Sequence, residues 1–201
     1  MAVYATLAEL KEQLTIPSAT TEFDSMLNDR LEAASRGIDN HTDRLTGFVL
    51  DATATAKVVN PRRRTIREDD GERLLLPWDI GSLTGLIVEV GSGSSWTAVT
   101  NYETEPDGAL DEDKPIEGLL RTASVWQASP TQRVRITAKW GYPILPQTVV
   151  DATLLQAARL FKRRQSPEGV LGNSEFGLIR VARIDPDVQE LVKNLVRPAV
   201  G

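Results

Sequence analysis

The spacing of apolar residues changes twice along this 201-residue chain, and each change predicts a switch in secondary structure. In residues 1–44 and 143–165, apolar side chains recur every three or four positions, as on one face of a helix. In residues 45–142, short apolar runs alternate with Gly, Pro, Asn and Asp, which is typical of strands and turns. The chain is therefore expected to be α+β: a helical frame (two N-terminal helices plus a long C-terminal helix) with an inserted small antiparallel β-unit. Residues 166–201 form an extended C-terminal tail ending in a short helix.

Two helices are expected in the N-terminal part of the frame. Thr6 and Glu9 have the spacing of a capping box, in which the hydroxyl and the carboxylate satisfy backbone N–H groups at a helix start. Thr21, followed three residues later by Asp24, predicts the start of a second helix. The apolar stripe of that helix ends at His41, and we interpret this histidine as a packed or C-terminal capping residue rather than a ligand or base.

The middle of the chain contains six candidate strands with turn residues between them. They are Thr55–Val59, Arg73–Leu76, Leu86–Val90, Thr97–Tyr102, Ile116–Leu120 and Arg133–Trp140. Residues 91–95 read Gly-Ser-Gly-Ser-Ser, which predicts a hairpin tip.

The C-terminal helices have clear start and stop signals. The long helix begins at Pro146, and Lys162, Arg163 and Arg164 place positive charge at its negative end. In the tail, Asp185 is expected to be the N-cap of the short helix and Pro186 its first residue. A helix this short needs a surface to pack on, either in its own domain or in another subunit.

The composition leaves few means of catalysis. With no cysteine and one histidine, the chain has no disulfide, thiolate metal site or cysteine nucleophile. It also has no Walker-type, Gly-x-Ser-x-Gly or His-Glu-x-x-His motif. We therefore predict a protein that is not an enzyme and has no cofactor and no catalytic or metal site. Because the chain has neither a signal-peptide pattern nor a long apolar run, a soluble, intracellularly made protein without a membrane contact is expected.

The net charge of -5 has the wrong sign for a protein that binds nucleic acid over its whole surface. Within the chain, however, two segments carry opposite charges. Residues 103–113 contain six carboxylates and no Lys or Arg. A calcium site is conceivable there, but the spacing does not fit an EF-hand, and a solvated acidic loop is the main interpretation. Residues 57–67 contain five cations and no acid. They would contact phosphates, form an exposed turn after Pro61, or pair with acidic residues of a neighbouring subunit. The candidates for inter-subunit charge pairing are Arg62, Arg63, Arg64, Asp107, Asp111, Glu112 and Asp113.

Both ends of the chain resemble a known family. The run Trp140-Gly141-Tyr142-Pro143, the following Pro146 and the helix over 149–164 carry the resemblance, together with parts of 166–188. Residues 4–11 fit the same pattern. These blocks, about half of the chain, resemble the head-to-tail connector (adaptor or head completion) proteins of tailed double-stranded-DNA bacteriophages.

The resemblance implies a structural protein of the virion neck, made in the host cytoplasm. Such an adaptor binds the portal vertex as a ring, typically twelve-fold, and extends the DNA channel used in ejection. It also presents a platform for the next neck or tail-completion protein. Its partners would be the portal protein, neighbouring copies of itself and that next protein, while genomic DNA passes without specific binding. The portal-docking candidates are Arg163, Arg164, Ser166, Pro167, Gly169, Val170, Leu171, Phe176, Ile179, Val181, Val188, Leu191, Val192 and Leu195.

Two other hypotheses come from the charged segments. One is a nucleic-acid-binding regulatory protein that uses the loop Arg62–Arg64. The other is a carbohydrate- or metal-dependent hydrolase that uses the acidic residues of 103–113.

Overall fold

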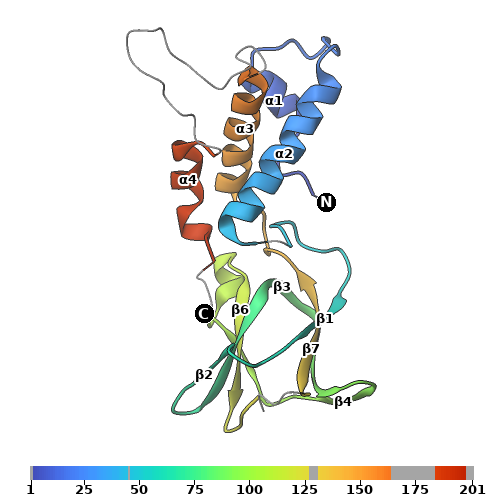
Figure 1. The fold of residues 1–201 in the computed structure, drawn as a ribbon, viewed down its shortest axis with the longest axis vertical. Helices are drawn as coiled ribbons and strands as arrows, with labels where there is room; N and C mark the ends of the chain where they lie inside the picture. The colour runs from blue at the N-terminus through green and yellow to red at the C-terminus, as the bar shows by residue number, and fades with distance from the viewer. Residues whose placement is uncertain (1, 45, 127–130, 164–183, 198–201) are drawn as a thin grey trace. The chain divides into compact units, whose positions relative to one another are not determined.

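The computed structural model describes residues 2–44, 46–126, 131–163 and 184–197. These residues form two compact units (Figure 1). The helical unit contains residues 2–44 together with 146–163 and 184–197, and the β-unit contains the described residues between 46 and 145. The predicted α+β class, with an antiparallel sheet, is confirmed. The division between the units falls after Leu145, three residues beyond the expected end of the insertion.

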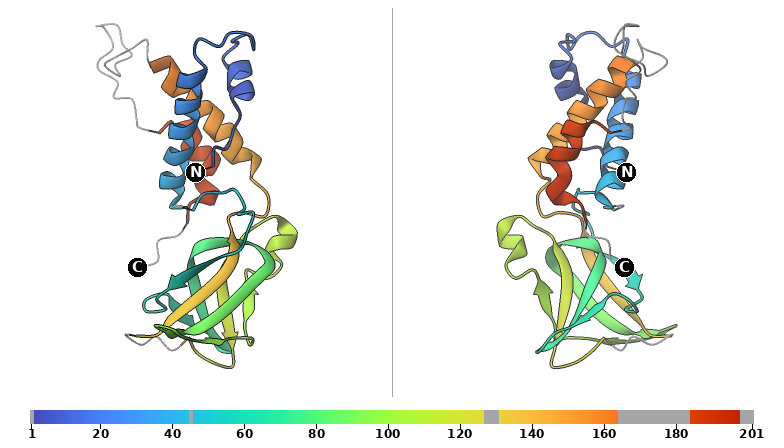
Figure 2. Two further views of the ribbon diagram at one scale, coloured as in Figure 1. Left: turned by 90° about the vertical axis from the view of Figure 1, so that its right-hand side faces the viewer. Right: turned by 60° about the vertical axis from the view of Figure 1, so that its left-hand side comes forward.

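Four helices form the helical unit. They are α1 (Leu7–Gln13), α2 (Asp24–Thr42), α3 (Gln147–Lys162) and α4 (Pro186–Val192), and the one-turn 3-10 helix η3 (Lys193–Leu195) continues α4. Figure 2 shows α2, α3 and α4 running side by side, and α1 packs against both α2 and α3. Their core includes Leu10, Leu27, Leu31, Ala157 and Phe161, all buried. The apolar stripes seen in the sequence thus face one another.

The two N-terminal helices begin differently. At α1 the predicted capping box is confirmed, because the Glu9 amide donates to the Thr6 hydroxyl (3.3 Å) and the Thr6 amide donates to the Glu9 carboxylate (2.7 Å). The predicted start of the second helix at Thr21 is wrong: α2 begins at Asp24 and has no side-chain cap. The reason is tertiary, since the buried Lys11 ammonium binds the Thr20 carbonyl (2.8 Å) and the Asp24 carboxylate (2.5 Å) and holds this segment as a turn.

Seven antiparallel strands form the β-unit. They are β1 (Thr55–Val59), β2 (Thr65–Arg67), β3 (Gly71–Ser92), β4 (Ser95–Ala98), β5 (Glu103–Glu105), β6 (Ile116–Thr122) and β7 (Arg133–Trp140), with a 3-10 helix η1 (Ala109–Glu112) after β5. The order along the sheet is β1-β7-β3-β6-β5, and β2 and β4 each pair with β3. The strands curve around a common core (Figure 2), which contains Leu74, Ile80, Leu119, Ile136 and Trp140.

Strand β3 is the main departure from the sequence prediction. The expected strands Arg73–Leu76 and Leu86–Val90 are two parts of it, the first pairing with β6 and the second with β7. The ladder to β6 shifts register between Leu75 and Ile80, where Pro77 has no N–H to donate. The expected strand Thr97–Tyr102 is right only for Thr97 and Ala98, because pairing in β4 begins at Ser95 and ends at Ala98. The hairpin tip is confirmed by the pairing of Ser92 with Ser95.

The motif Trp140-Gly141-Tyr142 fixes the end of β7 to the start of β1 and to the segment that precedes it. The Trp140 indole N–H donates to the Thr55 carbonyl (2.9 Å), and the Tyr142 ring packs on Phe48 with centroids 5.0 Å apart. Between them, Gly141 has a φ of 116°, and a Cβ there would lie 2.3 Å from the Val49 carbonyl oxygen. Only glycine fits this position, which explains why the motif has this form.

Candidate assembly surfaces

The predicted arginine loop is an exposed turn between β1 and β2. The Arg64 amide donates to the Pro61 carbonyl (3.0 Å), and Arg63 takes a positive φ of 61°. Arg62, Arg63 and Arg67 are exposed, whereas Arg64 is half-buried. No carboxylate of the described residues pairs with any of these four guanidinium groups. The turn therefore presents positive charge that the described part of the chain does not neutralise.

The acidic segment is more structured than the solvated loop that the sequence predicts. The Glu105 carboxylate accepts a hydrogen bond from Arg73 (3.1 Å), and the same guanidinium pairs with Glu68 (3.0 Å). Burial nevertheless raises the pKa of Glu105, against the lowering effect of Arg73. Glu112 pairs with Lys114 at 2.6 Å, and both side chains are exposed. Two of the six carboxylates are thus paired within the β-unit.

The other four carboxylates of the segment lie in two places. Glu103 and Asp107 line a groove, described below, whereas Asp111 lies in η1 and Asp113 directly follows it. All four are exposed, and no cation of the described residues forms an ion pair with them. Within residues 2–44, 46–126, 131–163 and 184–197, no group of three or more His, Asp and Glu side chains is arranged to hold a metal ion.

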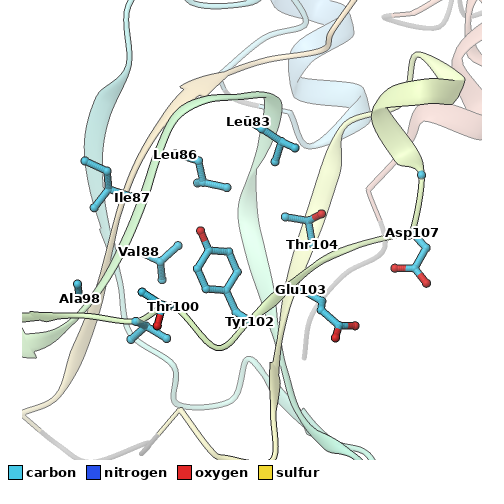
Figure 3. Close-up of a pocket in the computed structure, with 12 residues that line it drawn as sticks. Leu83, Leu86, Ile87, Val88, Ala98, Thr100, Tyr102, Glu103, Thr104 and Asp107 are labelled. Atoms are coloured by element: carbon cyan, nitrogen blue, oxygen red, sulfur yellow. The ribbon is translucent and has the colours of Figure 1, made fainter.

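A groove of about 720 Å³ lies between β3 and β5. Figure 3 shows the Tyr102 ring facing Leu86 and Val88 across it, with Glu103 and Asp107 toward one end. At the rim, Leu83 is 55% exposed and Ile87 is 50% exposed. Partial burial raises the pKa of the Tyr102 hydroxyl. The groove therefore combines apolar walls with two carboxylates.

Sequence reasoning missed this groove. The run 86–90 was expected only to be a strand, and in the structure Val88 is buried while Ile87, its neighbour, faces outward. The alternation of one apolar side chain in and one apolar side chain out was the available signal. It did not reveal that Tyr102 would lie opposite, because no local pattern links the two segments.

The C-terminal docking candidates fall into two groups. Arg164, Ser166, Pro167, Gly169, Val170, Leu171, Phe176, Ile179 and Val181 lie outside the described residues. Arg163 is the C-cap of α3, and the remaining four lie on α4 and η3. Val188 and Val192 are fully buried, and α4 packs on α3 of its own chain. Leu191 is 38% exposed and Leu195 is half-buried, so these two side chains remain accessible.

Polar contacts hold the start of α4 on the helical unit. The expected cap is confirmed, since the Asp187 amide donates to the Asp185 carboxylate (3.0 Å) and Pro186 is the first helical residue. The same carboxylate pairs with Arg159 of α3, and the Asp185 amide donates to the Gln156 side chain (3.2 Å). Asp185 thus starts α4 and attaches it to α3.

The end of the described tail is attached as well. The Arg44 side chain donates to the Leu195 carbonyl (2.7 Å), and the Arg197 amide donates to the Thr42 carbonyl (2.9 Å). Thr42 is the last residue of α2 and Arg44 follows its C-cap. The described tail therefore contacts the end of α2 as well as α3. The surface that the short helix needs is therefore supplied by its own chain. Among the described helices, none combines the length and the apolar character needed to cross a membrane.

The comparisons with known proteins support the resemblance at the level of the fold. No protein-family model and no curated protein matches the chain. Among solved structures, a chain from the neck of an empty GTA (gene transfer agent) particle, computed with C6 symmetry, is 20% identical and has a TM-score of 0.58. A chain from the neck of a native GTA particle, computed with C12 symmetry, is 19% identical and has a TM-score of 0.48. Each alignment covers 100% of this chain and 96% of the other.

The first of these alignments defines the fold of the whole chain. Both units are included, because no part of the sequence is left outside the match. The structural neighbour that shares this fold is thus a chain from the neck of a GTA particle.

Proposed function

We propose that this chain is a structural protein of a virion neck, a head-to-tail adaptor that binds the portal vertex as a ring. The ring would be twelve-fold, as in the connector proteins that the sequence resembles. It would extend the DNA channel and present a platform for the next neck or tail-completion protein. The observation that carries the proposal is the full-length likeness in fold to a chain from a GTA particle neck.

The proposed partners follow from this role. They are the portal protein, neighbouring copies of the chain and the next neck protein, with genomic DNA passing through the channel without specific binding. The net charge of -5 supports the last point, because a chain with a net negative charge repels a polyanion at long range. The chain would be made in the host cytoplasm, act without catalysis or a cofactor, and make no membrane contact.

The portal-docking part is proposed to be residues 163–181, together with the accessible side chains of Leu191 and Leu195. The helices on either side of this segment both pack in the helical unit, because Val188 and Val192 of α4 are buried against it. The assignment of Val188 and Val192 as direct docking residues is therefore replaced by an anchoring role.

The test exchanges residues 166–181 for a Gly/Ser segment of equal length and leaves α4 intact. We expect the exchanged chain to fold, because α3 and α4 still pack on each other, but to lose attachment to portal-bearing capsids. The matched control replaces Glu190 and Lys193, an exposed ion pair on α4 and η3, by alanine, and should attach normally. Normal attachment of the Gly/Ser variant would overturn the docking assignment, and absence of the original chain from mature particles would overturn the function.

A second function, a nucleic-acid-binding regulator, is favoured by one observation: Arg62, Arg63 and Arg67 are exposed without a carboxylate partner in the described residues. It predicts duplex binding that weakens with salt, with a log–log slope of about -0.9 per phosphate contacted. Absence of duplex binding at low salt would contradict it.

A further inference from the structure

The arginine turn and the groove lie at opposite edges of the same four strands. Strand β3 pairs with β2 through residues 72–74, and the same residues pair with β6 on the other side. Strand β6 then pairs with β5. The local order is therefore β2-β3-β6-β5. Among the described strands, β2 pairs with β3 alone and β5 with β6 alone, so both outer edges can accept another chain.

The registers place the two edges on a common face. Ile66 of β2 pairs with Arg73, Arg73 pairs with Leu120, and Leu120 pairs with Glu103 of β5. Paired residues point to the same side of a sheet, so Ile66 and Glu103 share one face. Three strand spacings of about 4.8 Å separate them, roughly 14 Å in all. Because the outer edges of β2 and β5 point in opposite directions along the strand order, a second copy could meet one edge without blocking the other.

The β2 edge combines positive charge with an exposed apolar side chain. We call residues 61–67 the basic edge, because four of the seven are arginine. Arg62, Arg63 and Arg67 are exposed, and Ile66 between them is 47% exposed. An apolar side chain surrounded by arginines is the composition expected at a protein interface.

The β5 edge has the complementary character. The groove beside it has apolar walls at Leu83, Leu86 and Tyr102, and carboxylates at Glu103 and Asp107. Glu105, on the same strand, is already paired with Arg73, whereas Glu103 and Asp107 pair with no cation of the described residues. The groove can therefore take an apolar side chain while its two carboxylates meet guanidinium groups.

We infer that the groove receives the basic edge of a second copy of this chain, with Ile66 on the apolar walls and Arg62, Arg63 and Arg67 near Glu103 and Asp107. The inference rests on the proposed function and specifies its subunit contact. Because the two surfaces differ and lie on opposite edges, the contact runs head to tail, and a head-to-tail contact closes into a ring when its rotation allows.

A disulfide cross-link tests this contact directly, because the chain has no cysteine of its own. The full-length variant Ile66→Cys with Leu83→Cys is assembled into particles and oxidised. Both positions are exposed, so the variant should fold as the original chain does. A cross-link needs Cβ atoms within roughly 4.5 Å of each other. We expect a ladder of covalent multimers, since each copy would be linked to two neighbours.

Matched variants control for random collision. The pair Ile66→Cys with Ile144→Cys uses a site that is 60% exposed but does not line the groove, and it should give no ladder. Single-cysteine variants should give no ladder either. A chain that is present in the neck but gives no ladder from positions 66 and 83 would overturn the inference and leave the function standing. A chain that is absent from particles would overturn the function.

A charge reversal tests the contact independently of the cross-link, and it distinguishes a second copy of the chain from DNA as the partner of the basic edge. Changing Arg62 and Arg63 to Glu should lower incorporation into particles by roughly tenfold or more, because like charges would then face each other across the contact. Changing Glu103 and Asp107 to Arg in the same chain should restore it. Failure of this restoration would overturn the inference. If the arginine reversal instead removes duplex DNA binding, DNA is the partner of the basic edge, and the inference is also overturned.

Discussion

Replacing Val188 and Val192 by alanine is expected to release α4 from the helical unit. Both side chains have no exposed surface and lie four residues apart on the face that packs on α3. Each change removes two carbon atoms, so at about 0.8 kcal/mol per buried carbon the loss is about 1.6 kcal/mol per site, before any cavity cost. The double variant should therefore lose roughly 3 to 4 kcal/mol of docking free energy.

This loss is large for the element concerned. Helix α4 has seven residues and η3 adds three, which is too short for a stable helix without a packing surface. The contacts of Asp185 and of the Leu195 carbonyl would not hold the helix once its apolar face is weakened. We expect residues 186–195 to lose amide protection, while α2 and α3 keep theirs.

The assay is amide hydrogen exchange on the full-length chain, together with urea unfolding. The matched control is Leu191→Ala, on the same helix but 38% exposed, which should change the unfolding free energy by about 0.5 kcal/mol or less. Unchanged protection of α4 in the double variant would refute the argument that these two valines anchor the segment. The same result would remove the anchoring role from the proposed function.

Three further outcomes are expected. Tyr4→Phe removes the hydroxyl that donates to the buried Asp39 carboxylate. The free energy of unfolding measured in urea should fall by about 1.5 to 3 kcal/mol, and a fall below about 0.5 kcal/mol would contradict this. Gly141→Ala should lower the free energy of unfolding by at least about 2 kcal/mol, because its Cβ would clash with the backbone. Gly93 also has a positive φ, but a Cβ there would have no atom within 4 Å, so Gly93→Ala should lower it by about 1 kcal/mol. Equal losses in the two variants would contradict the clash at Gly141. Burial raises the pKa of Glu105, so this carboxyl holds its proton more readily in the folded chain than in the unfolded chain just above pH 4.5, and its own contribution to stability falls there as the pH rises. Glu105→Gln should flatten that fall in a pH series of unfolding curves, and an unchanged slope would contradict it.

The features that the sequence predicted well depend on short-range interactions. The Thr6–Glu9 capping box and the Asp185 cap each join groups within three residues, so the local sequence contains both partners. The strand Arg133–Trp140 was predicted with its bounds, because its alternation records which side chains face the core. The start of the long α3 was predicted to within one residue, because Pro146 precedes a run of apolar residues at helical spacing.

The errors lie where distant residues decide the outcome. The start of α2 moved to Asp24 because Lys11, on another helix, binds that carboxylate. The two runs in β3 looked separate because Pro77 interrupts them, yet pairing with β6 and then β7 makes them one strand. Side chains 19 residues apart, Leu83 and Tyr102, meet in one groove that neither segment predicts by itself.

The sequence by itself determined that two helical ends enclose a β-rich middle, because the period of apolar residues is a local property of the backbone. It also showed that α4 must pack on something. Only the tertiary structure decided that the surface is the chain's own α3, since an apolar stripe specifies burial but not a partner. In the same way, the two charged segments were visible in the sequence, but only the strand order placed them at opposite edges of one sheet.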